Sequence, residues 1–336
     1  MTAAPANAPA PTSTAPAPRG RAIPALAPIA QCLSVRSLYP FVLRWFAAIE
    51  PSTRAATKVL DVPAGTGVLS APLAAAGFDV TPADLFPEYL EKAERLYHGP
   101  SVVSAFERET GVTMDPAVRA ALFGAKVADA PRPGHLRAVA ADMEAPLPFP
   151  DASFDVVLCV EGIEHVVDRH KTLRELRRVL KPGGRLLITT PNLLSLRARV
   201  AFALTGQRAM KSYIDEHTSV WGRSPDGQRT YHGHAFLVSY YQLRYSMHHT
   251  GLRVRRLLRS NWSPSSILLS PLALAVWLGT RLAQRRAVRK FERLRKSGEI
   301  PSDAAPPYDE ILRHIMSPAI LFNATLIVEA EAVADQ

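Results

Sequence analysis

The chain has 336 residues, of which 47% are hydrophobic and 21% are charged, a composition typical of globular proteins. These values exclude a wholly disordered chain, a collagen-like chain and a membrane protein with many spans. The two cysteines, Cys32 and Cys159, lie far apart and no residues show zinc-ligand spacing. Neither a disulfide framework nor a structural zinc site is therefore expected, and a reducing cytoplasm is the expected compartment.

The formal net charge of +10 is concentrated in one segment. Residues 281–296 contain six arginines, two lysines and one glutamate, a net charge of +7, so the rest of the chain carries only +3. A broadly basic nucleic-acid-binding face on the main domain is not expected for this reason. The segment instead predicts one local basic helix whose partner is an anionic surface.

The first part of the chain divides into a tail and a helix. Residues 1–30 are rich in alanine and proline, which predicts a disordered tail. Within residues 34–50, apolar and aromatic side chains recur at helical spacing, which predicts a helix. These side chains are Leu38, Phe41, Val42, Trp45 and Phe46.

From residue 58 onward, strand-like runs alternate with helix-like stretches, which indicates a parallel sheet covered by helices on both faces. The expected strands are 58–62, 78–80, 137–140, 154–160, 185–190, 252–258 and 319–329. The expected helices are 68–76, 87–97, 167–180, 193–204 and 239–249. The last strand is expected to close the sheet as an antiparallel edge strand.

This pattern predicts a main domain at 31–260, a helical appendage with apolar and basic residues at 261–300, and a closing strand with the C-terminus at 301–336. Within the main domain, the long connection at 99–134 is expected to be a partly helical insertion.

The clearest motif is a glycine turn at residues 59–68, with the sequence VLDVPAGTGV. Gly65 and Gly67 lack the Cβ atoms that would keep a bulky ligand away from the backbone, and the amides at the start of the next helix face such a ligand. On its own the signal is modest. Ser70 replaces the third glycine of a dinucleotide-binding motif, and no phosphate-binding lysine follows.

Two acidic residues further along make the motif more specific. Asp84 follows the second strand, where a carboxylate can accept hydrogen bonds from both ribose hydroxyls. Asp142 follows the next strand and precedes Met143, which puts an acceptor for an exocyclic amine beside an apolar contact. The segments FPDASFDVV at 149–157 and LKPGGRL at 180–186 come next. In this order and at these intervals, the residues resemble the class I S-adenosylmethionine-dependent methyltransferases, from 59 to 192 and more loosely to 329.

The resemblance implies a doubly wound, Rossmann-like, seven-stranded and mostly parallel sheet, with S-adenosylmethionine across the carboxyl ends of its first strands. Pro63 replaces the family's usual first glycine, which removes one backbone donor. The resemblance assigns Asp61 to the methionine amino group, the turn Pro63, Ala64, Gly65, Thr66 and Gly67 to the methionine part, Asp84 with its neighbour Leu85 to the ribose, and Asp142 with Met143 to adenine.

Methyl transfer from a sulfonium is an in-line displacement, so alignment of the reactants and exclusion of water contribute most of the catalysis. The end of the fourth strand reads EGIEH, and a turn into a helix there brings Glu161, Glu164 and His165 together. His165 is the preferred general base, ahead of His232 or His234, because a histidine beside the cofactor cleft titrates near neutral pH. In this superfamily the acidic residue at the position of Glu161 meets the cofactor.

Two similar families share the E-x-x-E-H cluster: ubiquinone-pathway O-methyltransferases, and small-RNA 2′-O-methyltransferases, which add a distant histidine to hold a divalent metal. Here that histidine would be His232 or His234. Carboxylate and imidazole ligands suit Mg²⁺ or Mn²⁺, which lower the pKa of an acceptor hydroxyl. Two alternatives are open: a metal site made of Glu161, Glu164, His165 and His234, and the metal-free arrangement that is frequent in this superfamily.

The late segment has two interpretations. Residues 267–278 form an almost wholly apolar run of twelve residues, too short to cross a bilayer, which takes about twenty. Joined to the basic segment 281–296, the run is typical of an interfacial membrane anchor. The alternative is a helix packed on the catalytic core or in a dimer. The stretches TPNLLSL at 190–196 and LTG at 204–206 are similar to methyltransferases of envelope-polysaccharide pathways, which favours a lipid-linked acceptor.

The predicted function is S-adenosylmethionine-dependent methylation, at oxygen, of a small or lipid-linked acceptor. The insertion 99–134 and the region after Leu204 are expected to form the acceptor pocket, and residues 267–296 are a candidate for contact with the inner face of the membrane, with the packed helix as the open alternative. Alternatives are an RNA 2′-O-methyltransferase, which needs the metal cluster and a basic channel, and a cofactor-binding pseudoenzyme. Nucleic acid is not an expected partner.

Overall fold

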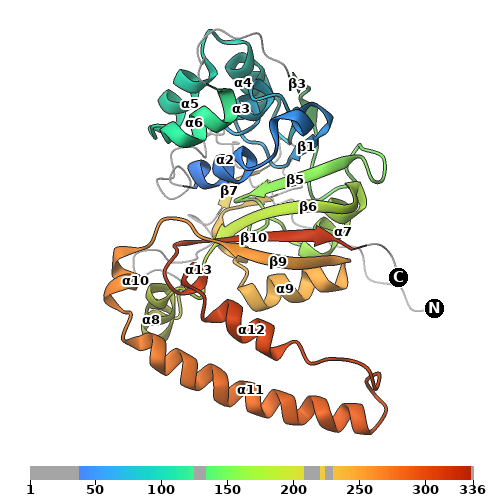
Figure 1. Ribbon diagram of the computed structural model, residues 1–336, viewed down its shortest axis with the longest axis vertical. Helices are drawn as coiled ribbons and strands as arrows, with labels where there is room; N and C mark the ends of the chain where they lie inside the picture. Colours follow the sequence, from blue (N-terminus) through green and yellow to red (C-terminus); the bar gives the residue numbers. More distant parts are fainter. Residues whose placement is uncertain (1–37, 125–133, 208–219, 224–229, 334–336) are drawn as a thin grey trace, which may run out of the picture.

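The computed structural model describes residues 38–124, 134–207, 220–223 and 230–333. The predicted tail at 1–30 and Cys32 lie outside the described residues. The middle layer of the molecule is a sheet of eight strands (Figure 1). These strands are β1 (Lys58–Asp61), β2 (Asp79–Asp84), β3 (His135–Leu136), β4 (Val139–Ala140), β5 (Phe154–Val160), β6 (Leu180–Pro191), β9 (Leu252–Leu258) and β10 (Thr325–Ala332).

The strand order is β3-β2-β1-β5-β6-β10-β9, and β4 also pairs with β2. β3 and β4 therefore share one place in the sheet, where the sequence predicted a single strand at 137–140. β1, β2, β5 and β6 pair in parallel, as β2 does with β3 and β4, whereas β10 is antiparallel to both of its neighbours. The predicted mostly parallel, Rossmann-like sheet is confirmed.

The predicted position of the last strand was wrong in two respects. The chain first forms a short helix, α13 (Pro318–Leu321), whose cap Ser317 accepts a hydrogen bond from the Ile320 amide, so β10 begins only at Thr325. β10 is also not an edge strand. It lies between β6 and β9, and seven of its eight residues are buried, since side chains of an interior strand pack on both faces.

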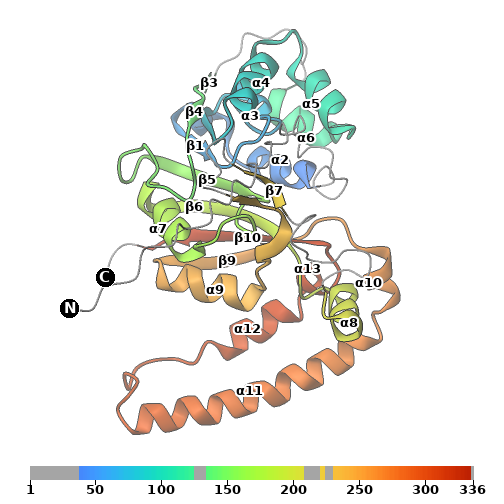
Figure 2. The ribbon, with the colours of Figure 1, turned by 180° about the vertical axis from the view of Figure 1, so that it is seen from behind.

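Helices cover both faces of the sheet, as Figure 2 shows from behind. Neighbouring strand residues point to opposite faces, so Val59 belongs to one hydrophobic core and Leu60 to the other. The helices over the first core are α2 (Tyr39–Ala47), α3 (Ser70–Ala75), α4 (Pro87–His98), α5 (Val102–Thr110) and α6 (Pro116–Phe123). Those over the second are α7 (Arg169–Val179), α9 (Tyr240–His249), α12 (Tyr308–Ile315) and α13.

The insertion predicted at 99–134 is partly helical, since it contains α5 and α6. Ser101 caps α5 by accepting a hydrogen bond from the Ser104 amide, and Asp115 caps α6 in the same way through the amides of Ala117 and Val118. Buried residues of both helices belong to the core that α2 and α3 also form, so the insertion enlarges that core.

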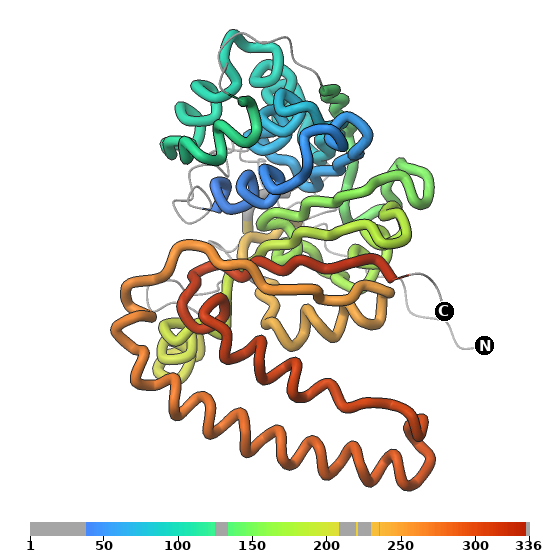
Figure 3. The backbone as a smooth tube through the Cα atoms, in the orientation of Figure 1, coloured from blue at the N-terminus to red at the C-terminus, as the bar shows by residue number. Residues whose placement is uncertain are grey.

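Except for η2, which directly precedes β1, the remaining elements follow strands β6 and β9 or lie between them in the chain. They are η2 (Pro51–Ala56), η3 (His234–Phe236), α8 (Leu196–Thr205), α10 (Pro264–Leu268), α11 (Leu272–Lys296) and the antiparallel pair β7 (Val220–Arg223) and β8 (Thr230–His232). α11 has 25 residues, none of them buried, and runs along α12 away from the sheet (Figure 3). None of the helices in the described part of the chain is both long and apolar enough to span a bilayer.

Candidate active site

Two adjoining pockets lie at the carboxyl ends of the parallel strands and share Pro63 and Glu161. The larger pocket encloses about 680 Å³, counting the part open to solvent. Its lining residues follow β1, β2, β4 and β5 or belong to β8: Val62, Pro63, Asp84–Phe86, Ala141–Glu144, Glu161, Gly162, His165, Val166 and Thr230–His232. The smaller pocket is lined by Tyr39, Asp61, Pro63–Thr66, Val68, Leu69, Tyr89, Val160 and Glu161.

The two glycines of the turn have different surroundings. Both have positive φ, which favours glycine. A Cβ atom on Gly65 would have no heavy atom within 4 Å, so the turn leaves open space at this residue. A Cβ atom on Gly67 would lie 2.2 Å from the Cβ of Ala93 on α4, and Gly67 lines neither pocket. Gly67 therefore allows the turn to pack closely on α4, while Gly65 borders the pocket.

The first two predicted acidic residues are both buried. The Asp84 carboxylate accepts hydrogen bonds from the amides of Gly65 (2.8 Å) and Phe86 (3.1 Å), and burial raises its pKa to about 6 despite these bonds. Asp61 accepts a hydrogen bond from the Ser70 hydroxyl at 2.6 Å, and burial raises its pKa to about 7. A bound group that carries positive charge or hydroxyl donors would favour the ionised form of both carboxylates.

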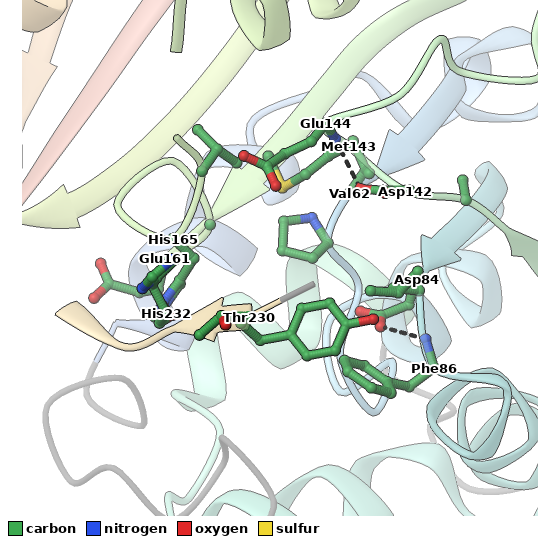
Figure 4. A pocket seen from close by; sticks show the side chains of 16 residues that line it. Val62, Asp84, Phe86, Asp142, Met143, Glu144, Glu161, His165, Thr230 and His232 are labelled. Atoms are coloured by element: carbon green, nitrogen blue, oxygen red, sulfur yellow. Dashed lines mark hydrogen bonds between the residues drawn. The ribbon is translucent and has the colours of Figure 1, made fainter. Parts of the chain in front are cut away.

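The third predicted acidic residue lies along another side of the larger pocket. Asp142 accepts a hydrogen bond from the Glu144 amide at 2.9 Å, which orders the loop after β4. Figure 4 shows Asp142, Met143 and Glu144 on this side, Asp84 and Phe86 on a second, and Glu161 and His165 opposite them. An acceptor and an apolar side chain therefore stand together, as the sequence predicted.

Glu161 follows β5 in a conformation that side chains rarely adopt, with a φ of 49°. Its position is set by the hydroxyl of Thr189 on β6, which accepts a hydrogen bond from the Glu161 amide (2.9 Å) and donates one to its carboxylate (3.1 Å). The next residue, Gly162, touches Pro63, because a Cβ atom there would lie 2.4 Å from the proline Cδ. Glu161 thus lies where the two pockets join.

His165 lines the larger pocket in a defined tautomer. Its Nδ1 lies 2.9 Å from the carbonyl oxygen of His232 and 3.2 Å from that of Gly233. A carbonyl only accepts, so Nδ1 carries the hydrogen and Nε2 of the neutral ring carries the lone pair. Burial lowers the pKa of His165, although these two bonds oppose the shift. The ring is therefore neutral at pH 7 and able to accept a proton.

Glu164 lies behind the pocket, fully buried. Neither of its carboxylate oxygens has a hydrogen-bond partner among the described residues, and burial together with the charge of Glu161 holds its pKa well above the usual range. One potential ligand atom each of Glu164, His165 and His234 lies within 4.8 Å of the others. This group contains three of the four residues of the predicted metal site, with His234 as the histidine from the distant segment, and Glu161 is not part of it.

Sequence reasoning missed the aromatic side chains of the site. Phe86 and Tyr231 of the larger pocket are in edge contact, with ring centroids 5.7 Å apart, and Tyr39 and Tyr89 line the smaller pocket. Their aromatic character was the available signal, but only the fold shows which aromatic residues reach the pockets. The described residues of the insertion at 99–134 line neither pocket, and residues 125–133 lie outside the described part of the chain, so the predicted part of the insertion in the acceptor site stays a prediction. Residues 230–232, after Leu204, do line the larger pocket.

Comparisons with known proteins identify the domain. Residues 60–188 match the family model described as "Methyltransferase domain". A ubiquinone biosynthesis O-methyltransferase from Xanthomonas axonopodis pv. citri (strain 306) is 34% identical over 171 residues, 51% of this chain and 55% of that protein. A demethylmenaquinone methyltransferase from Clavibacter sepedonicus is 36% identical over 134 residues, 40% of this chain and 41% of that protein.

The chain thus spans about half the length of the curated relatives that it matches. Among solved structures, a SAM-dependent methyltransferase from Methanosarcina mazei aligns with a TM-score of 0.41 and 15% identity, over 83% of this chain and 93% of that chain. The family match and the curated relatives identify residues 60–188 as an S-adenosylmethionine-dependent methyltransferase domain.

Proposed function

We propose that this chain transfers the methyl group of S-adenosylmethionine to a hydroxyl oxygen of a small or lipid-linked acceptor, with His165 as general base. The observation that carries the proposal is the hydrogen bond from His165 Nδ1 to the His232 carbonyl oxygen. It leaves the lone pair on Nε2 of a neutral ring that lines the larger pocket. Several curated relatives are named ubiquinone biosynthesis O-methyltransferases, which supports oxygen as the accepting atom.

The cofactor supplies an activated methyl group on its sulfonium. We assign its binding to the glycine turn and to the carboxylates of Asp61, Asp84 and Asp142, with Leu85 and Met143 as apolar contacts and Glu161 at the junction of the pockets. The ionised carboxylates suit the amino group and hydroxyls of such a ligand. His165 takes the proton of the acceptor hydroxyl, and the surrounding apolar side chains exclude water.

Two features favour an acceptor with an apolar or aromatic body over RNA. Phe86, Tyr231 and Val166 give the larger pocket an apolar wall that suits such a body. The eight cationic residues of the basic segment 281–296 lie on α11, away from both pockets, so they form no channel into the site. A ribose 2′-hydroxyl in a polyanionic chain would need such a channel.

The group formed by Glu164, His165 and His234 fits a divalent cation. A fully buried carboxylate without a hydrogen-bond partner gains a partner when a cation binds, and carboxylate with imidazole suits Mn²⁺ or Mg²⁺. Ligation would use Nε2 of His165, the same lone pair that a general base needs, so an ion held by these three residues is an alternative to general-base catalysis by His165 and would itself lower the pKa of the acceptor hydroxyl.

The cation can be tested without any turnover assay. The cation alternative predicts that titration with Mn²⁺, followed by electron paramagnetic resonance, gives one bound ion for the parent and a loss of at least about tenfold in affinity for Glu164→Gln. The variant Glu175→Gln, which changes a carboxylate outside the site, should bind as the parent does. Equal binding by all three proteins would show that these residues hold no ion.

The function itself is tested in two steps. Calorimetric titration with S-adenosylhomocysteine should show micromolar binding to the parent that is lost in Asp84→Ala. Labelled S-adenosylmethionine should then label a hydroxyl acceptor from a panel of quinols, phenols and lipid-linked sugars. Binding of the cofactor without transfer to any acceptor would favour a pseudoenzyme, and failure of a folded parent to bind it would overturn the assignment of the site.

A further inference from the structure

The outward face of α11 changes character along the helix. Leu274, Leu278 and Leu282 follow one another at intervals of four residues, so they share one side of the helix. Their exposed fractions are 65%, 49% and 56%, which is unusual for leucine. The first half of α11 thus presents an apolar stripe to solvent.

The same face becomes cationic in the second half of the helix. Arg286, Arg289, Arg293 and Lys296 continue the stripe at intervals of three or four residues, and all four are exposed. The only acidic residue of this half, Glu292, pairs with Arg295 at 2.6 Å. Apolar and cationic side chains are therefore separated along the axis of α11, not around it.

Two neighbouring helices also carry exposed apolar side chains. Phe202 and Leu204 on α8 are 64% and 69% exposed, and Leu268 on α10 is 81% exposed. α8 and α10 lie side by side at the start of α11 (Figures 1 and 2), joined by a hydrogen bond of 3.3 Å from the Arg197 amide to the Ser266 hydroxyl. The basal face, as we name it, consists of the α11 residues Leu274, Leu278, Leu282, Arg286, Arg289, Arg293 and Lys296.

The opposite side of α11 is held by α12, so the basal face points outward. Asp309 of α12 accepts a hydrogen bond from Gln284 at 2.6 Å and lies 3.7 Å from Arg281. α12 is in turn joined to α9 on the sheet by the ion pair of Arg244 and Glu310, at 3.1 Å. The exposure of the stripe thus follows from where α11 is anchored.

We propose that the basal face docks on a bilayer containing anionic phospholipid. Its apolar half matches the boundary between headgroups and acyl chains, and its cationic half matches the anionic headgroups. A second copy of the chain fits less well, because two such faces bring arginines together in a parallel pairing and leucines against arginines in an antiparallel one.

The basal face begins at the edge of the sheet that carries the pockets. α8 follows the carboxyl end of β6, and α10 follows that of β9. Docking would thus hold that edge near the bilayer. The inference does not depend on the methyl acceptor, so it stands or falls apart from the proposed function.

The test is flotation of the full chain with vesicles of phosphatidylcholine alone or of phosphatidylcholine mixed equally with phosphatidylglycerol. The parent should float with the anionic vesicles and weakly with the neutral ones. The variant Arg286→Gln/Arg289→Gln/Arg293→Gln should partition about 100-fold less into anionic vesicles, since each cation near the surface contributes about a factor of five. The variant Leu274→Gln/Leu278→Gln/Leu282→Gln should lose at least about tenfold.

A matched control removes three exposed cations from other helices: Arg95→Gln/Arg108→Gln/Lys171→Gln. This control should float as the parent does, and circular dichroism with thermal unfolding of all variants reports that they are folded. If the control and the arginine variant float equally, the loss of binding depends on net charge and not on the basal face, and the proposal is overturned. It is also overturned by a parent that floats with neither vesicle, or by one that instead forms a dimer which the leucine variant abolishes in sedimentation.

Discussion

The carboxylate of Asp84, at the end of β2, accepts a hydrogen bond of 2.8 Å from the amide of Gly65, in the turn after β1. Two neighbouring strands are thus joined at the point where the pockets open. A ligand that binds Asp84 therefore meets a carboxylate already oriented by the backbone.

Asp84→Asn keeps the shape of this side chain and removes its charge. The affinity for S-adenosylhomocysteine should fall roughly 10- to 100-fold, since a hydrogen bond to a charged group contributes about 1.5–3 kcal/mol. Calorimetry measures the change. Asp79→Asn, at the other end of the same strand, is the control and should bind as the parent does.

The two glycines of the turn should respond differently to alanine. Gly67→Ala brings a methyl group against Ala93 at a positive φ, so the free energy of unfolding should fall by about 2–4 kcal/mol. Gly65→Ala introduces only the backbone strain, so the free energy of unfolding should fall by about 1–2 kcal/mol. Its methyl group fills open space beside the pocket, which should weaken cofactor binding. Urea unfolding and calorimetry on both variants separate the two effects, and identical losses of stability would contradict this explanation.

The affinity for S-adenosylhomocysteine should rise with pH from about pH 5 to about pH 8. In the free protein the pKa values of Asp61 and Asp84 are raised to about 7 and about 6, so both carry protons at the acid end of this range. The ligand's amino group and hydroxyls favour the ionised forms. Asp61→Asn should remove the part of the rise centred near pH 7, and a variant with an unchanged pH profile would show that Asp61 does not meet the ligand.

The same two carboxylates predict how the stability of the free protein depends on pH. Their pKa values are higher in the folded than in the unfolded state, so the folded state binds more protons between about pH 4 and about pH 7. Their contribution to stability is full below the unfolded pKa and is lost as the pH rises through the folded pKa. The free energy of unfolding, measured with urea at several pH values, should change more steeply with pH across this window for the parent than for Asp61→Asn.

His165→Gln should lower the rate of methyl transfer by about 10²- to 10⁴-fold, the range typical of a general base. Binding of S-adenosylhomocysteine should change by no more than about twofold, because the variant leaves the predicted cofactor-binding side chains in place. The control His249→Gln changes an exposed histidine of α9 and should keep full activity. If His165→Gln transfers the methyl group as fast as the parent, another residue is the general base.

Glu329 stabilises the sheet through buried polar contacts. Its carboxylate accepts hydrogen bonds from Trp45 Nε1 at 2.9 Å and from Arg185 at 3.0 Å, and it also pairs with Arg256. Burial raises the pKa of Glu329, but these partners outweigh burial and hold the pKa below its usual range. Glu329→Gln should lower the free energy of unfolding by about 1–3 kcal/mol at pH 7.

The depressed pKa also sets the sign of the pH dependence at Glu329. Its contribution is present above the unfolded pKa and disappears as the pH falls through the folded value, so parent and variant should converge in acid. Glu331→Gln, which removes a more exposed pair with Arg255, should cost less than about 1 kcal/mol. If both substitutions lower the free energy of unfolding equally, the buried carboxylate of Glu329 contributes no more than an exposed ion pair.

Much of the fold could be predicted because its signals are local. β5 at 154–160 and β9 at 252–258 have the predicted bounds, since continuous apolar or alternating runs mark both. The place of β10 could not be predicted, because strand order depends on which neighbours pair across the sheet. The periodicity of 319–329 also could not reveal that Ser317 caps a separate short helix.

The candidate site was predictable where a residue stands at a fixed distance from a strand end. Asp61, Asp84, Asp142 and Glu161 all reach the pockets for this reason. The hydroxyl of Thr189, which positions Glu161, and the aromatic ring of Tyr231 could not be found in this way. Their places depend on strand pairing and on the β7–β8 hairpin, which contacts in three dimensions decide.

The interior position of β10 has a consequence for biosynthesis. Among the strands of the described residues, β9 pairs with β10 alone, and β10 pairs with β6, whose residues are made more than a hundred positions earlier. β9 therefore leaves the ribosome with no strand to join. The half of the sheet that carries α8, α10 and α11 can assemble only after residue 332 has been synthesised, so a nascent chain stalled before that point should expose β6 to chaperones.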